Sequence, residues 1–305
     1  MKQATEACYR QKYDSSWQVL LPLTSDATDP APVYGQAGIL QALCLEKGSR
    51  SLGDSFHFLN DRAEALCQGR LANSTKDTLA YFYLGMCRLN RANFYAWEQR
   101  RNQAVKALMP ASTPLRTALG LDPSLTDAYY GLGMIEYFKA EGDKFLLGLG
   151  ILGTKESAIA NVRKAAEGSG LSAVSARFSL AWMLGQEKQY PEAIKLCRLL
   201  LDRYPGNRVL LRTIRDIHYR KADYDATLQT GRELEENVLA SYPENKYYLS
   251  ENWLVMAKAH KRLNQPDSCL VLLDSVIAWE PFKESVPWLR TYVADAKALK
   301  KTIEK

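Results

Sequence analysis

A glycine-rich stretch is the segment whose residue types come nearest to ligand chemistry. Gly148, Gly150 and Gly153 match the G-x-G-x-x-G pattern of dinucleotide-binding turns, and Thr154 and Lys155 complete a P-loop whose last two residues are exchanged. A phosphate cradle requires a buried strand that leads into the turn, because the following helix must point its N-terminus at the phosphate from a fixed sheet edge. The residues before this stretch follow a helical period instead. We therefore expect no nucleotide or other cofactor.

The other residue types that support catalysis or metal binding are thinly spread. The three histidines, His57, His218 and His260, occur in no His-Glu-x-x-His motif, and the chain has neither a Cys-x-x-Cys pair nor a Gly-x-Ser-x-Gly elbow. The acidic run over residues 233–236 has the spacing of a solvated helix surface. We expect no catalytic residue and no metal site, and hence no enzyme.

The cysteines are far apart in the sequence, at Cys8, Cys44, Cys67, Cys87, Cys197 and Cys269. Dispersed thiols favour reduced, packed side chains in a reducing compartment. The alternative is one or two disulfides in an oxidising compartment.

Composition narrows the class of protein. The chain has 305 residues, 47% hydrophobic and 24% charged, which predicts a folded protein of two domains or one extended array. Its net charge of +6 is diluted by acidic neighbours, unlike the dense basic stripe of nucleic-acid binders, so we expect no nucleic acid as partner. Because no apolar run reaches the roughly 18 residues of a membrane-spanning helix, we expect no integral membrane contact. Residues 1–6 contain no apolar stretch that would serve as a signal peptide.

An internal repeat organises the elements that would position any functional side chain. In its clearest copy, residues 174–207, apolar residues recur at three- and four-residue steps before Pro191 and again before Pro205. This pattern predicts two helices, because proline is tolerated at a helix start but not inside one. Small residues at Ala181 and Ala193 would let the two helices approach closely.

Further copies of the pattern run along the chain. Residues 250–283 repeat every interval, and the copy between these two is degenerate because Arg215 replaces the small residue. Residues 78–123 and 124–173 keep the pattern but carry insertions between their helices, and the match before residue 75 is loose. The repeats predict about seven helix pairs followed by a terminal helix.

These aromatic, Leu-Ala, small-residue and closing-proline positions resemble the tetratricopeptide repeat family. The resemblance implies an all-α fold, an α-α superhelix or solenoid, in which the first helix of each pair lines a concave groove that holds peptides or partner helices. The chain also resembles bacterial tetratricopeptide proteins with long early helices and a central apolar insertion, many of which are exported. That resemblance implies an exported or periplasmic protein if Met1 is not the natural start, whereas the chain as given indicates a cytoplasmic one.

We expect a single tetratricopeptide-like solenoid over residues 1–305. Its expected parts are degenerate repeats with long helices over 1–123, a repeat with an insertion over 124–173, three more regular repeats over 174–283, and a capping helix over 284–305. The insertion, residues 142–154, contains Phe145, Leu146 and Leu147. The favoured interpretation packs it over neighbouring helices, and the alternative is a peripheral apolar contact with a partner or a lipid surface.

Counting from the small residue of each first helix predicts which side chains face the groove. They are Phe82, Met86, Tyr130, Met134, Tyr137, Phe178, Trp182, Arg212, Tyr219, Lys258 and Lys261. The aromatic and Met-rich middle suits apolar anchors, while the basic C-terminal part suits acidic residues or a terminal carboxylate. The favoured interpretation of Phe82, Phe178 and Trp182 assigns them to the core between repeats, which leaves Tyr130 and Tyr137 as the better contact candidates.

The sequence thus predicts a non-enzymatic scaffold that binds a protein or peptide in this groove. Two alternatives remain open. The first is a small-molecule or lipid-binding protein, or an enzyme, that uses residues 142–154 as a lid. The second is a structural assembly subunit, since solenoids can stack through their ends.

Overall fold

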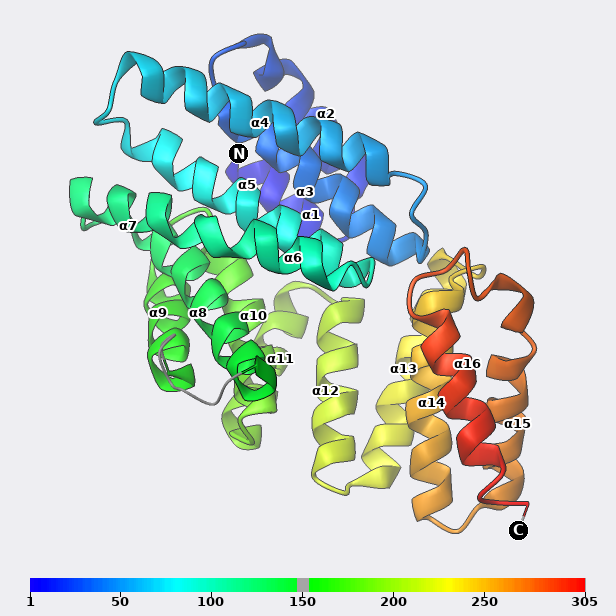
Figure 1. Cartoon of the computed structure of the whole chain (residues 1–305). Coiled ribbons are helices and arrows are strands. Elements are labelled where there is room, and N and C mark those ends of the chain that lie inside the picture. The colour runs from blue at the N-terminus through cyan, green and yellow to red at the C-terminus, as the bar shows by residue number, and fades with distance from the viewer. Residues whose placement is uncertain (147–153, 305) are drawn as a thin grey trace. The chain divides into compact units, whose positions relative to one another are not determined.

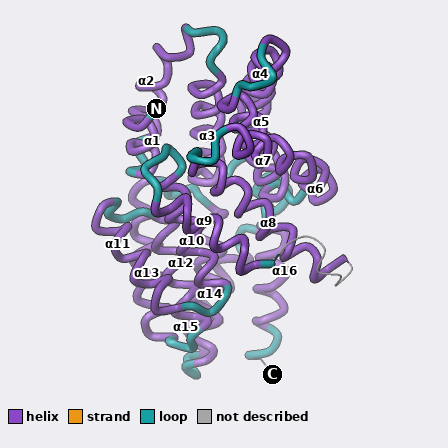
Figure 2. Tube along the Cα trace, turned by 90° about the vertical axis from the view of Figure 1, so that its left-hand side faces the viewer, coloured by secondary structure: helices purple, strands orange, loops and turns teal. Residues whose placement is uncertain are grey.

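The computed structural model describes residues 1–146 and 154–304, apart from the side chains of residues 142–146 (Figure 1). Within these residues all regular secondary structure is helical and none is strand (Figure 2). The predicted all-α class, with helices in consecutive pairs, is therefore confirmed. The chain groups into two compact units, one formed by residues 1–41 and 54–184 and the other by residues 42–53 and 185–305.

The first unit contains the early helix pairs, in which α3, α4, α5 and α8 have 18 to 21 residues each. In chain order its elements are α1 (Lys2–Tyr9), α2 (Tyr13–Leu20), the 3-10 helix η1 (Leu21–Ser25), α3 (Pro30–Lys47), α4 (Gly53–Asn73), α5 (Thr78–Trp97), α6 (Arg101–Leu108), η2 (Met109–Ala111), α7 (Ser112–Leu121), α8 (Thr126–Leu146), α9 (Lys155–Glu167) and α10 (Ala173–Gln186). The short α6 and η2 fill the insertion that the sequence places between the helices of the 78–123 copy.

The second unit contains the more regular pairs and the terminal helix. Its elements are α11 (Tyr190–Arg203), α12 (Arg208–Arg220), α13 (Tyr224–Ser241), α14 (Lys246–Arg262), α15 (Pro266–Ile277), η3 (Glu280–Phe282) and α16 (Leu289–Lys300). The last turn of α3 also belongs to this unit. The prediction of one solenoid over 1–305, with divisions at residues 123, 173 and 283, stays a prediction.

The turn between the two helices of a pair recurs in the same form. A non-glycine residue with positive φ lies two positions before α2, α6, α11, α13 and α15, at Gln11, Gln99, Lys188, Ala222 and Asn264 respectively. The following amide then reaches back across the turn, as when the Asp223 N–H donates to the His218 carbonyl at 3.0 Å. This left-handed cap ends one helix and sets the entry of the next, so the helix pairs that share this turn are aligned in the same way.

Small residues allow the helices of a pair to pack closely. At Gly133 on α8, an added Cβ would lie 2.6 Å from the Val162 Cγ2 atom and 2.7 Å from the Ala158 carbonyl oxygen of α9. In the second unit the interior side chains of α14, α15 and α16 form one apolar core that includes Leu254, Leu273 and Val293. Burying these apolar stripes against neighbouring helices is what stabilises elements that are marginal alone.

A buried ion pair fixes residues 42–53 within the second unit. The Glu46 Oε2 atom accepts a hydrogen bond from the Arg208 Nε–H at 2.5 Å, and the Glu46 carbonyl oxygen accepts one from the Asn245 side-chain amide. Asn237 and Ser241 of α13 accept from the other end of the Arg208 guanidinium. The two buried charges thus neutralise each other, and both Glu46 and Arg208 make further hydrogen bonds, as a buried ion pair requires.

Candidate partner-binding faces

The eleven predicted groove residues all lie on the first helices of their pairs, which are α5, α8, α10, α12 and α14. The seven from Phe82 to Trp182 belong to the first unit and the other four to the second. Five of them are buried: Phe82, Met86, Met134, Tyr137 and Phe178. Tyr130, Trp182, Arg212, Tyr219 and Lys258 are half-buried, and Lys261 is exposed. The half-buried and exposed residues keep surface that a partner can contact, and the buried ones shape the wall behind them.

In the first unit, tyrosines from successive helices converge on one face, which we call the tyrosine cluster: Tyr9, Tyr34, Tyr83 and Tyr130. The Tyr34 and Tyr83 ring centroids, from α3 and α5, lie 5.5 Å apart. Tyr130 of α8 lies within electrostatic reach of Tyr34, and its hydroxyl is 3.4 Å from the Ser179 hydroxyl of α10. First helices of four consecutive pairs therefore contribute to this face.

Helix α1 lies on the same face. The Tyr9 hydroxyl donates to the Ser175 Oγ atom of α10 at 2.5 Å, and its ring centroid is 4.6 Å from that of Phe178. At the other end of α1, a Cβ added to Gly35 of α3 would lie 3.4 Å from the Met1 Cε atom. Between these ends α1 packs against α2, whose Ser16 hydroxyl donates to the Ala4 carbonyl oxygen at 2.7 Å.

Burial controls the protonation of the cluster. Removal from water raises the pKa of Tyr34 well above its ordinary value, and neighbouring phenols, Tyr130 first among them, raise it further. Burial likewise raises the pKa of Tyr83 and of Tyr130. These phenols therefore stay neutral hydrogen-bonding groups and cannot act as bases near neutral pH.

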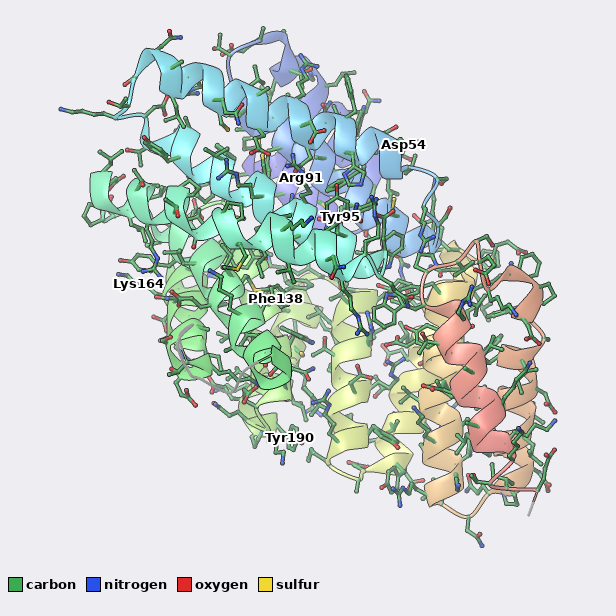
Figure 3. The ribbon with its side chains drawn as sticks, in the orientation of Figure 1. Asp54, Arg91, Tyr95, Phe138, Lys164 and Tyr190 are labelled. Atoms are coloured by element: carbon green, nitrogen blue, oxygen red, sulfur yellow. The ribbon has the colours of Figure 1, made fainter. Side chains whose placement is uncertain are left out.

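A second aromatic group lies further along the same unit. The Trp182 ring centroid of α10 is 5.3 Å from that of Tyr137 and 6.2 Å from that of Phe138, both of α8. Phe138 is labelled on α8 in Figure 3. The Lys155 ammonium of α9 lies 5.1 Å from the Tyr137 ring centroid, a cation–π contact that closes the buried side of this group. Trp182 and Phe138 keep part of their surface exposed, whereas Tyr137 is buried.

In the second unit the predicted basic face is largely neutralised from within. Arg212 of α12 donates from Nε to the Glu251 Oε1 atom of α14 at 2.9 Å, and Arg215 lies 3.3 Å from the other carboxylate oxygen. Arg215, which has no exposed side-chain surface, also pairs with Asp216 and donates to the Asn252 amide oxygen at 2.9 Å. Burial alone would raise the pKa of Glu251, yet the two guanidinium groups hold it below its ordinary value.

The remaining predicted groove residues of this unit, Tyr219, Lys258 and Lys261, are held by fewer contacts than Arg212. The Tyr219 and Tyr224 ring centroids lie 5.8 Å apart at the turn between α12 and α13. The Lys261 ammonium donates to the Thr302 hydroxyl at 2.6 Å, on the exposed surface after α16. Lys258 and Lys261 therefore supply the accessible positive charge of this face, whereas Arg212 is committed to Glu251.

Sequence reasoning did not single out several of these residues. Tyr9 and Glu251 belong to no repeat position, and Arg215 was read as a degenerate replacement of a small residue. Their roles depend on partners far away in the chain, as with Tyr9 and Phe178, which a local period cannot reveal. A signal was present only for Tyr34, which occupies the aromatic position of an early repeat.

The apolar insertion, membrane contact and metal binding were also addressed by the sequence. Phe145, Leu146 and Leu147, and most of the predicted insertion 142–154, lie outside what the structure describes. Among the described residues no helix is long and apolar enough to cross a membrane. Within that same part of the chain, no three His, Cys, Asp or Glu side chains gather closely enough to hold a metal ion.

No protein-family model matches the chain, and no curated protein matches its sequence. Solved structures do match. The APC/C hetero-tetramer Cut9-Hcn1 contains a chain that aligns with a TM-score of 0.62 and 13% identity, over 98% of this chain and 49% of that one. The type IV pilus biogenesis factor PilW aligns with a TM-score of 0.52 and 16% identity, over 84% and 97% of the two chains. Human IFIT1, solved as a dimer with m7Gppp-AAAA, aligns with a TM-score of 0.51 and 12% identity, over 90% of this chain and 58% of that one.

Cut9 and PilW are tetratricopeptide-repeat proteins, and they share with this chain the order of consecutive helix pairs. The chain has the tetratricopeptide-repeat fold. Identities of 12 to 16% establish the fold alone, so these neighbours carry no residue role to this chain. The predicted fold resemblance is confirmed, and the alternative of a small-molecule or lipid-binding protein is not favoured. The expectation that nucleic acid is no partner is not confirmed, because the IFIT1 structure holds m7Gppp-AAAA.

Proposed function

We propose that the protein is a non-enzymatic scaffold that binds a peptide or a partner helix on the inner faces of its first helices. The tetratricopeptide-repeat fold supports an interaction role in general, and the Cut9 neighbour is itself solved in a hetero-tetramer with Hcn1. One observation carries the finer proposal. The half-buried side chains of Tyr130 and Trp182 present large aromatic surface from α8 and α10, the first helices of neighbouring pairs.

The chemistry of this face suits a helix better than an extended polyanion. Its groups are neutral phenols and hydroxyls, which bury aromatic surface and accept single hydrogen bonds. In the second unit the guanidinium groups of Arg212 and Arg215 are already paired with Glu251 and Asp216. Lys258 and Lys261 remain to receive an acidic residue or a terminal carboxylate of the same partner class.

Trp182 and Tyr130 are the proposed contact residues of the first unit, because they combine large aromatic surface with partial exposure. Aromatic anchors of this kind dominate the energetics of most interfaces. Phe82, Met86, Met134, Tyr137 and Phe178 would shape the surface around them from below.

The test selects helical peptides from a display library against the full chain and measures their affinities for variants. We expect Trp182→Ala to weaken the selected peptides by about tenfold or more, the usual effect of removing an aromatic anchor. Tyr190→Ala serves as the matched control, since Tyr190 is an aromatic residue at the start of α11, the second helix of its pair, and is none of the proposed contact residues. Unchanged affinity in both Trp182→Ala and Tyr130→Ala, with circular dichroism showing intact folding, would refute the face assignment.

A further inference from the structure

Helix α6 adds to the repeat an element that buries none of its own side chains. Helices α5 and α7 pack against each other in the 78–123 copy, and α6, which lies between them in the sequence, packs on α5 (Figure 1). No residue from Arg101 to Leu108 is buried. Ordering these eight residues costs conformational entropy that buried apolar surface normally offsets. The helix is therefore explained better by the surface that it presents than by any core that it forms.

The chain fixes α6 at both ends. Before its first turn, the Arg100 guanidinium lies 4.6 Å from the centroid of the Tyr95 ring, which is labelled in Figure 3, and pairs with Glu98 at 3.1 Å. After its last turn, the Arg88 guanidinium of α5 donates to the Pro110 carbonyl oxygen at 3.1 Å. The helix is thus held in place in advance, which lowers the ordering cost of binding on it.

The residues of α6 divide into two sides. Ala104, Ala107 and Leu108, spaced three and four apart, are half-buried and form the side toward α5. The outward side carries Val105 and the following Met109, which keeps the helical conformation, and these two are 50% and 51% exposed. Single exposed aliphatic side chains are ordinary on a protein surface, but these two are neighbours on one helix face.

The charges around this apolar pair are all positive. Arg101, four residues before Val105, and Lys106, next to it in the sequence, are exposed. Among the described residues neither makes an ion pair with an acidic side chain. Residues 101–111 contain no aspartate or glutamate. We call the surface formed by Arg101, Val105, Lys106 and Met109 the α6 face, and its electrostatic complement is an apolar surface flanked by carboxylates.

We propose that the α6 face binds an acidic amphipathic helix of another protein, whose apolar residues pack on Val105 and Met109 while its carboxylates reach Arg101 and Lys106. A helix is favoured because its own apolar residues, three and four positions apart, match the spacing of Val105 and Met109. Carboxylates on the flanks of that apolar stripe then lie beside the two cations. The inference goes beyond the proposed function, since no residue of the α6 face belongs to the first-helix faces.

Two other anionic partners fit this face less well. An anionic membrane takes up a whole apolar helix face rich in Trp, Phe or Leu, whereas the α6 face offers two aliphatic side chains. A single-stranded nucleic acid needs a dense set of cations and exposed rings on which its bases stack. The nearest such groups are already engaged, because Arg100 lies over the Tyr95 ring and pairs with Glu98.

The experiment measures binding of the full chain to a fluorescent synthetic helix of about 15 residues, with leucines in one stripe and glutamates on both flanks, by anisotropy at low salt. We expect Val105→Ser combined with Met109→Ser to weaken binding about tenfold or more, because both apolar contacts are lost. Arg101→Glu combined with Lys106→Glu should weaken it by a similar factor and remove most of its salt dependence. The same charge-reversed protein should gain binding of a peptide with lysines in place of the glutamates.

Matched controls change the same residue types elsewhere. Val271 of α15 is 65% exposed, and Lys76 is an exposed lysine before α5, so Val271→Ser and Lys76→Glu should bind the probe as the unaltered protein does. Trp182→Ala and Tyr130→Ala should also leave probe binding unchanged. The substituted positions of the α6 face are exposed, and circular dichroism checks that each variant folds.

Three results would overturn the inference. The first is binding of the probe no tighter than that of a peptide of the same composition with its leucines scattered, and the second is equal probe affinity for the unaltered protein and both α6 double variants. The third is binding to phosphatidylglycerol vesicles or to an RNA oligonucleotide that exceeds probe binding and is lost in the same variants. Each of these results would leave the first-helix faces, and hence the proposed function, standing.

Discussion

The buried pair of Glu46 and Arg208 offers a test of how the second unit is held together. Both residues are almost fully buried, at 2% and 3% exposure, and the atoms that pair lie 2.5 Å apart. We expect Arg208→Met to destabilise the protein strongly, because it leaves the Glu46 carboxylate buried without a counter-charge.

The expected loss of stability follows from two opposing contributions, the attraction between the two charges and the cost of removing them from water. At an effective dielectric constant of about 20, two charges at this separation attract by about 6 to 7 kcal/mol. Removing each ion from water costs several kcal/mol, so the intact pair contributes little net stability. Removing one partner forfeits the attraction but keeps the burial of the other charge, and such changes cost about 3 to 5 kcal/mol.

A double variant separates these terms. Arg208→Met combined with Glu46→Leu removes both charges, and we expect it to be within about 1 to 2 kcal/mol of the unaltered protein or more stable. Urea unfolding followed by circular dichroism gives the free energies, and hydrogen exchange of α12 and α14 reports the second unit by itself. A cost below about 1 kcal/mol for Arg208→Met, or a double variant as unstable as the sum of both single variants, would refute the reasoning.

Further predictions concern packing, pH and thiol reactivity. Gly133→Ala should lower the free energy of unfolding by about 1 to 3 kcal/mol, because the added methyl group overpacks against α9. At Gly69 an added Cβ would have no neighbour within 4 Å, so Gly69→Ala should stabilise α4 by about 0.5 to 1 kcal/mol in the same thermal or urea assay. The pKa of Glu251 is lower in the folded chain than its ordinary value. The ionised carboxylate should therefore stabilise the fold fully above about pH 4.3, and this stabilisation should be lost as the pH falls through the folded-state pKa. Glu251→Gln should flatten that part of a profile of unfolding free energy measured from about pH 6 to about pH 3. Burial raises the pKa of Cys197 to about 12, so at pH 8 iodoacetamide should modify it in urea but hardly in the native protein, as peptide mass spectrometry would show.

The repeated part of the fold was accessible from sequence because its causes are local. The proline that opens α11 and the stripe that ends before Pro205 fix the second helix of the clearest copy within a few residues. The turn before it needs only one residue in the left-handed conformation, and the chain supplies glutamine, lysine, alanine or asparagine at that position. No glycine is required there, which is why composition gave no sign of this turn.

The inner faces were less accessible because their contacts are remote. Tyr9 and Ser175 are 166 residues apart, and no periodicity relates them. The contacts of Arg215 were also hidden from the local repeat pattern. A large charged residue at a small-residue position indicates decay of the repeat, yet the structure satisfies it with Asp216, Glu251 and Asn252. Its meaning depends on helix α14, which the repeat pattern treats as an independent copy.

The hydroxyl groups of α10 give the first face a preference that burial of aromatic area alone would not. Ser175 and Ser179 are four residues apart and therefore on one side of the helix, where one lies against the Tyr9 hydroxyl and the other against that of Tyr130. Phenylalanine at position 9 would keep the ring contact with Phe178 but leave the half-buried Ser175 hydroxyl without the hydrogen bond that Tyr9 gives it. Sites built to pair a hydroxyl reject analogues that lack it more strongly than apolar pockets reject a missing methylene. The contact between α1 and α10 should therefore distinguish tyrosine from phenylalanine at position 9, and Tyr9→Phe should cost more stability than the loss of an exposed hydroxyl would.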